Sequence, residues 1–377
     1  MKKPFYQLQQ KQDLIRQFTP NWFTVTMGTG VAALVLAELP FANGALWQIG
    51  AAVWQFNIGL FAAFSILYAL RWLLYPDEAR QIFSHPVMSL FLGAIPMGLA
   101  TILNGLLKFG AALYGDTAVQ IAQLLWYADA ALALLIAWCV PFFMYSRQQH
   151  ELKSMTAVWL LPIVACEVAA ASGGLLLGHM NAGLHAAGIL LGSYVLWGIS
   201  VLPAFAVLTI LMLRLALHQL PPKEMAISSW LALGPIGTGA LALLALGQHA
   251  PQVLAAIGLQ ALGELFQHAG IFAALPLLGF GLWWLGIAVL STLSQLKGLP
   301  FNLGWWGLTF PLGVFTLAML NLGQQLQIGF FCSAAYALGA VLIGLWLMVA
   351  YQTAKGCYRG SLFFSPCLKA YLEQRGG

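Results

Sequence analysis

Three carboxylates fall within long apolar segments of the chain: Asp129, Glu167 and Glu264. A carboxylate is costly inside a bilayer, so each is a candidate for a functional residue. Glu167 is the strongest candidate because it follows Pro162 by five residues. Two interpretations of Glu167 stay open, a proton-coupling site and a structural acid hydrogen-bonded to a neighbouring helix. Asp129 indicates an interhelical contact, and Glu264 a helix entrance, where an acid suits the helix dipole.

Patterns typical of enzymes and metal sites are missing from the sequence. The seven histidines include no HExxH pair, and the five cysteines have no CxxC spacing. No serine–histidine–acid arrangement, phosphate-binding loop or dinucleotide fingerprint occurs. A membrane enzyme or receptor would need a polar cluster at one membrane face. We therefore expect no catalytic residue, no metal, no cofactor and no enzymatic activity.

The elements that must position these residues are membrane helices. The chain is 61% hydrophobic and 7% charged, whereas soluble domains carry about 25% charged residues. The composition predicts an all-α membrane protein that contacts lipid, formed by one transmembrane domain over 1–377. Ten apolar segments are long enough to cross a bilayer. They are Trp22–Glu38, Leu46–Leu74, Val87–Leu107, Val119–Tyr145, Met155–Leu177, Leu184–Leu217, Ala226–Leu246, Leu265–Leu293, Leu303–Leu322 and Gly329–Tyr351.

The positive charges alternate with these segments. All of the sixteen Lys and Arg residues except Lys108 fall on one side of the ten-segment arrangement. The positive-inside rule then predicts a protein of the inner (plasma) membrane with both termini cytoplasmic. Residues 1–19 and 356–377 would form its cytoplasmic N-terminal segment and tail. The basic residues therefore indicate topology, and we expect no nucleic-acid partner.

Helix breakers recur on alternate segments. Pro96, Pro162, Pro235 and Pro311 occur on the third, fifth, seventh and ninth, at spacings of 66, 73 and 76 residues. On the first segment, Gly28 and Gly30 take the place of the proline. Broken helices are tolerated where they are buried in protein or line a cavity. The pattern predicts five helical hairpins whose kinked members surround a central pore.

Two segments carry a resemblance to a known family. They are Thr19-Pro20-Asn21-Trp22-Phe23 with Met27-Gly28-Thr29-Gly30, and Phe301 to Pro311 with its Trp305-Trp306 pair and Thr309-Phe310-Pro311. The chain resembles the tellurite-resistance/dicarboxylate transporter family, which includes malate permeases, sulfite pumps and slow anion channels. The resemblance implies a homotrimer with one pore per protomer. It also implies that Phe310 plugs the pore, with Gly28 as the small residue beside it.

Phe310 has two competing interpretations from the residues alone, a pore gate and a phenylalanine that faces lipid or another helix. Phe315 is the nearest rival for the gate. No Lys or Arg falls on the segments predicted to form the pore, so attraction of an anion would depend on freed backbone N–H groups, helix dipoles and a basic cytoplasmic mouth. The resemblance implies anionic substrates: C4-dicarboxylates such as malate first, with sulfite, tellurite-type oxyanions, chloride or nitrate as the alternative.

Overall fold

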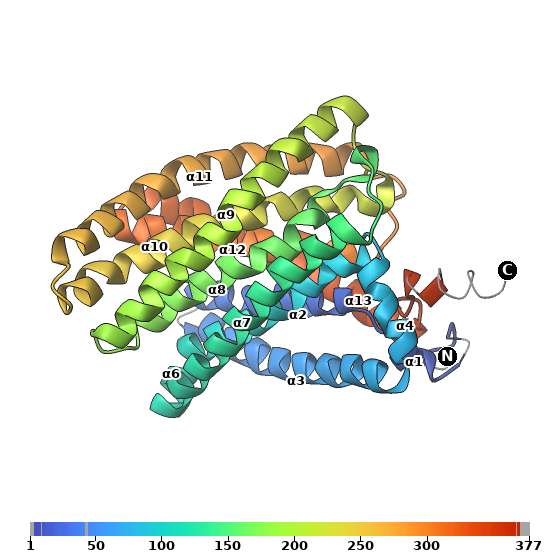
Figure 1. Cartoon of the computed structure of the whole chain (residues 1–377), viewed down its shortest axis with the longest axis horizontal. Coiled ribbons are helices and arrows are strands. Elements are labelled where there is room, and N and C mark those ends of the chain that lie inside the picture. The colour runs from blue at the N-terminus through green and yellow to red at the C-terminus, as the bar shows by residue number, and fades with distance from the viewer. Residues whose placement is uncertain (1–3, 9, 42–43, 367, 370–377) are drawn as a thin grey trace.

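The computed structural model describes residues 4–8, 10–41, 44–366 and 368–369, and all regular structure in these residues is helical. The predicted terminal segments 1–19 and 356–377 lie partly outside the described residues, as do Lys2, Lys3, Cys367 and Arg375. Both described ends of the chain lie at the same end of the molecule (Figure 1).

Ten helices account for the predicted membrane crossings. They are α2 (Phe23–Glu38), α3 (Ala45–Leu74), α5 (Ala94–Gly105), α7 (Asp116–Ser146), α8 (Leu161–Leu177), α9 (Leu184–His218), α10 (Leu233–Ala255), α11 (Gln260–Ser294), α12 (Phe310–Leu326) and α13 (Gly329–Arg359). Nine helical segments of the described chain are apolar and long enough to span a bilayer, and α2 is the shorter tenth. The prediction of a multi-pass, all-α membrane protein is therefore confirmed. Short helices, including α1 (Asp13–Arg16), α4 (Pro76–Arg80) and α6 (Ala111–Tyr114), connect them.

Several helices extend beyond their predicted ends. α10 ends at Ala255 rather than Leu246, and α13 at Arg359 rather than Tyr351. Apolar composition marks only the part of a helix inside hydrocarbon, whereas the backbone hydrogen bonds continue into the polar region. The 35-residue helices α9 and α11 exceed the roughly 20 residues that cross a bilayer, so they must tilt or project from it.

Buried and exposed helices alternate along the chain. The spans that contain α5, α8, α10 and α12 are 67–89% buried, and α2 is buried over most of its length. The spans formed by α3, α7, α9, α11 and α13 are only 17–33% buried. Figure 1 shows α2, α8 and α12 in the middle of the molecule, with α3 and α11 on opposite sides. The exposed helices carry large apolar side chains, as a lipid-facing surface requires.

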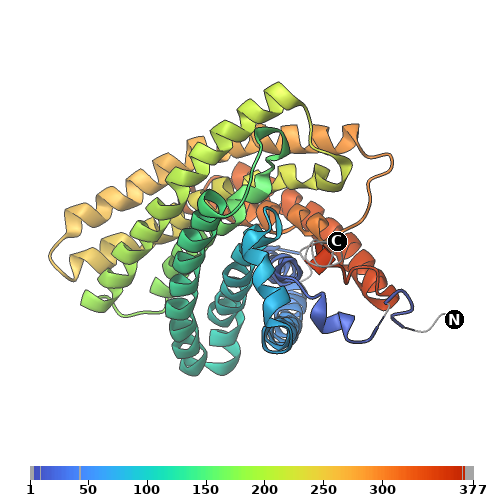
Figure 2. The same cartoon turned by 45° about the vertical axis from the view of Figure 1, so that its right-hand side comes forward.

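The five buried helices contact one another in a closed series: α2 with α5, α5 with α8, α8 with α10, α10 with α12, and α12 with α2. Each also packs on the exposed helix that follows it in the sequence, and Figure 2 shows this layering from a second side. A glycine lies at four contacts of the series, and a fifth, Gly93, lies directly before α5 where the chain meets α8; at each, an added methyl group would overlap the neighbour. These glycines are Gly30, Gly93, Gly174, Gly237 and Gly313.

The four prolines do not break an α-helix in its middle. Each is the second or third residue of an α-helix, directly after a 3₁₀ segment: Met88–Gly93, Ala157–Leu160, Lys223–Ala232 or Leu303–Leu308. Proline suits this position because the first turn lacks partners for its N–H groups anyway. Where the sequence predicted a kink at each proline, the structure therefore has a change from a 3₁₀-helix to an α-helix. On the first span, α2 continues as an α-helix through Gly28 and Gly30.

Candidate functional site

A cavity of about 340 Å³ opens at the end of the molecule that holds both termini. The early residues of all five buried helices line it. One from each is Met27, Met97, Leu161, Gly234 and Phe310. The 3₁₀ segments before the helices supply further lining, including Phe91, Leu160 and Trp306. This cavity is called the inner cavity below.

A second cavity of about 340 Å³ lies at the opposite end of the same helices. On each of the five helices a residue further along the chain than the inner lining residue lines it: Leu34, Asn104, Leu175, Leu241 and Leu317. Because earlier residues face one cavity and later residues face the other, the five helices run in the same direction. This cavity is called the outer cavity, and none of the described residues lines both cavities.

Along the helices, a layer of buried residues lies between the two sets of lining residues. On α2, α5, α10 and α12, the residue that lines the inner cavity and the residue that lines the outer cavity are seven positions apart in the sequence. One residue of the layer lies between them, four positions after the first and three before the second. These residues are Val31, Thr101, Thr238 and Val314, and Val168 occupies the corresponding place on α8. All five are at most 5% exposed. The sequence analysis missed this layer, although the four-and-three spacing could have indicated it.

Phe310 is one of the residues that line the inner cavity. It is the first residue of α12, is 4% exposed and lines the cavity one turn before Val314. The Thr309 hydroxyl before it donates a hydrogen bond of 2.6 Å to the Trp306 carbonyl, which fixes the turn into α12. Phe315, the predicted rival, instead packs against Gly237 and Gly281 on α10 and α11, and it lines neither of the two cavities.

The other predicted site residues divide into two groups. Pro311 lines the inner cavity, whereas Pro96, Pro162 and Pro235 position the lining residues next to them. Neither Gly28 nor Gly30 is among the lining residues described for the two cavities. A methyl group at Gly28 would overlap Thr309 and Trp306, so this glycine supports the turn that carries Phe310.

The buried carboxylates lie away from both cavities. Glu167 is fully buried where α8 meets α9 and α10, with Ser200 facing it and Gly239 close by. Asp129 is fully buried on the face of α7 that also carries Trp126. Neither carboxylate has a hydrogen-bond partner among the described residues. Glu264 is exposed on the second turn of α11 and accepts a hydrogen bond of 3.0 Å from Gln260.

The inner cavity differs from the expected basic mouth. Glu224 is the charged residue in its described lining, which contains no Lys or Arg. What the inner cavity offers an anion is the alignment of five parallel helices, because the positive ends of their dipoles point toward it. Side-chain charge at this end therefore plays a smaller part than the sequence suggested.

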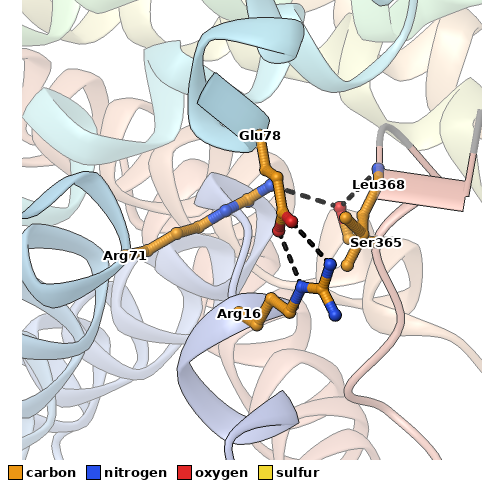
Figure 3. A network of polar contacts seen from close by, with 5 residues as sticks. All are labelled: Arg16, Arg71, Glu78, Ser365 and Leu368. Atoms are coloured by element: carbon orange, nitrogen blue, oxygen red, sulfur yellow. Dashed lines mark hydrogen bonds and ion pairs between the residues drawn. The ribbon is translucent and has the colours of Figure 1, made fainter. Parts of the chain in front are cut away.

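The segment after α13 forms part of the inner cavity's wall through Ser361, Leu362 and Phe364. Polar contacts hold this segment near the N-terminal region, as Figure 3 shows. Arg71 donates hydrogen bonds to the Ser365 hydroxyl at 3.4 Å and to the Phe18 carbonyl at 2.6 Å. Nearby, the Arg16 guanidinium binds both carboxylate oxygens of Glu78, at 2.8 and 2.5 Å.

The outer cavity is more polar. Its lining includes an ion pair between Lys108 and Glu38, with 2.5 Å between Nζ and Oε1. His179 follows the end of α8 and also lines the cavity. Burial lowers the pKa of His179 below its ordinary value, so the imidazole is neutral at pH 7.

Comparison with known proteins identifies a family and several relatives. Residues 17–354 match the family model described as voltage-dependent anion channel. The chain is 38% identical to a sulfite efflux pump of Arthroderma otae, over 91% of this chain and 92% of the relative. It is 28% identical to an uncharacterized transporter of Methanocaldococcus jannaschii, over 94% and 97%. It is 24% identical to the malic acid transport protein of Schizosaccharomyces pombe, over 96% and 84%.

Proposed function

The chain belongs to the voltage-dependent anion channel family, and from this membership we propose that it exports small inorganic anions, sulfite first among them. At the coarser level, it is an anion-transporting, multi-pass protein of the plasma membrane and not an enzyme. The single observation that carries the proposal is the pair of cavities in line at the two ends of five parallel helices.

The sequence analysis placed C4-dicarboxylates first and small inorganic anions second. The proposal reverses this order. Relatives named as sulfite efflux pumps are 38% identical to this chain, whereas the malic acid transport protein is 24% identical. The cavities support the same order. Dicarboxylates are typically held by bidentate arginine pairs, and the described lining of both cavities contains no arginine. Conduction requires binding weak enough for the ion to leave, and the absence of arginine from the described linings fits weak binding.

For the architecture, we propose five helical hairpins in a single domain over residues 1–377, with one central pore and cytoplasmic termini. The closed contact series of α2, α5, α8, α10 and α12 supports the pore. The Lys and Arg distribution supports the orientation, which would make the inner cavity the cytoplasmic mouth. A homotrimer with one pore per protomer is proposed from the family resemblance.

Phe310 is proposed as the gate of this pore. Phe310 lines the inner cavity and lies four residues before Val314 of the buried layer, which supports this role. An aromatic ring is large and apolar, so it can interrupt a column of water without adding charge. Val31, Thr101, Val168, Thr238 and Val314 would form a second, narrower barrier behind it.

A substrate panel on purified protein in proteoliposomes tests the proposed function. We expect sulfite and chloride to pass faster than malate, with protein-free liposomes as the control. Malate flux above sulfite flux would restore the dicarboxylate assignment. Flux of none of these anions would refute the proposed function.

A further inference from the structure

Lys108 differs from the other basic residues in its predicted side of the membrane. It is the only Lys or Arg predicted on the outer side of the membrane, and it lines the outer cavity. It lies on a π-helical turn, Leu106–Gly110, that interrupts the helical run between α5 and α6. Such turns occur frequently at functional sites because they redirect side chains.

Glu38, the last residue of α2, also lines the outer cavity and forms the ion pair with Lys108. The two side chains are only 27% and 38% exposed, so the pair is partly withdrawn from water. In the described lining, Glu38 and Lys108 are the charged residues of the outer cavity. The remaining polar lining consists of His179, which is neutral at pH 7, and the amides of Asn104, Asn321 and Gln324.

The helix dipoles make this end unfavourable for an anion. Three of the five parallel helices, α2, α8 and α12, end within two residues of a residue that lines the outer cavity. Their C-terminal ends carry partial negative charge. A cation is needed there to offset the dipoles. Lys108 can supply that charge, but the ion pair with Glu38 cancels most of it.

We propose that Lys108 is the anion-binding residue of the outer cavity and that Glu38 is its built-in counter-ion, which limits anion affinity at this mouth. The inference rests on the proposed function, because it assumes that anions pass through this cavity. A passing anion would bind the Lys108 ammonium group in competition with the Glu38 carboxylate. It would be released when Lys108 and Glu38 form their ion pair again. The ligand class is a small anion such as sulfite or chloride.

The size of the effect follows from Coulomb's law. A unit charge about 5 Å from an anion in a water-filled mouth changes the local anion concentration about fourfold, and more where the permittivity is lower. The effect weakens as salt rises, since the screening length falls to about 8 Å at physiological ionic strength. The two partners of the ion pair should therefore have opposite effects on flux.

Three variants reconstituted in proteoliposomes test this inference: Lys108→Gln, Glu38→Gln and the double variant. Sulfite and chloride flux at low salt should fall about fourfold in Lys108→Gln, because Glu38 then repels the anion. Flux should rise by a similar factor in Glu38→Gln, whereas the double variant should lie between the two. All three differences should shrink in high salt.

The design separates a functional role from a structural one. Both single variants lose the same ion pair, so a purely structural role predicts flux changes in the same direction and similar losses of thermal stability. Changes in the same direction, or differences insensitive to salt, would overturn the inference. Absence of anion flux in the unmodified protein would instead refute the proposed function itself, so the two failures are distinguishable.

Discussion

At the scale of single residues, position relative to the two cavities separates the candidates. Phe310 and Phe315 are the same residue type five positions apart, yet Phe310 lines the inner cavity and Phe315 packs between α10 and α11. Glu167 was the leading carboxylate in the sequence, but it lies behind α8 and outside both cavity linings. Since the carboxylate also has no hydrogen-bond partner among the described residues, its structural role and its proton-coupling role both stay predictions.

Glu167 gives a prediction at this scale. Glu167→Gln should leave the pH dependence of anion flux unchanged, because the carboxyl does not face the proposed path. Glu167→Met should raise the free energy of unfolding by about 1–3 kcal/mol, since it removes a buried polar group that has no partner. Flux assays across a pH series and thermal unfolding in detergent measure the two effects. A shifted pH profile in Glu167→Gln would restore the proton-coupling interpretation.

At the scale of helices, small residues and prolines have separate tasks. The prolines mark where a 3₁₀ segment becomes an α-helix, and the glycines allow the five buried helices to approach closely. Gly237 is the clearest example, because its Cβ position would lie 2.7 Å from the Phe315 backbone nitrogen. The interface cannot widen locally without disturbing both α10 and α12.

Gly237→Ala should therefore lower the free energy of unfolding by about 1–3 kcal/mol, the typical cost of overpacking. Gly286→Ala on α11 is the matched control, since nothing lies within 4 Å of the position an added Cβ would occupy. The control should leave thermal stability unchanged or slightly raised. Equal behaviour of the two variants would show that close approach of α10 and α12 does not require Gly237.

The sequence predicted the positions of the helices better than the bends within them and the contacts between them. Apolar length and charge alternation located all ten spans, because the bilayer imposes both patterns on the chain directly. At Gly28 and Gly30 the α-helix continues, and a bend there stays a prediction, because glycine has the same composition signal whether it bends a helix or lets a neighbour approach. The buried layer and the Lys108–Glu38 pair depend on how α2 and α5 rotate against each other. Packing sets that rotation, and no local pattern records it.

At the scale of the whole molecule, the account rests on five parallel buried helices with a cavity at each end. Their aligned dipoles favour an anion at the inner cavity and oppose it at the outer one, where Lys108 provides the compensating charge. The exposed helices then serve as the lipid-facing or protomer-facing layer. In the proposed pore, conduction through the middle requires that the Phe310 ring move aside.

Sulfite flux through proteoliposomes containing Phe310→Ala tests that claim most directly, with Phe315→Ala as the matched control. Both variants remove one buried phenylalanine from α12, but only Phe310 lines a cavity on the proposed path. The account predicts a several-fold rise in flux for Phe310→Ala and no rise for Phe315→Ala. Unchanged flux in Phe310→Ala, or an equal rise in both variants, would contradict it.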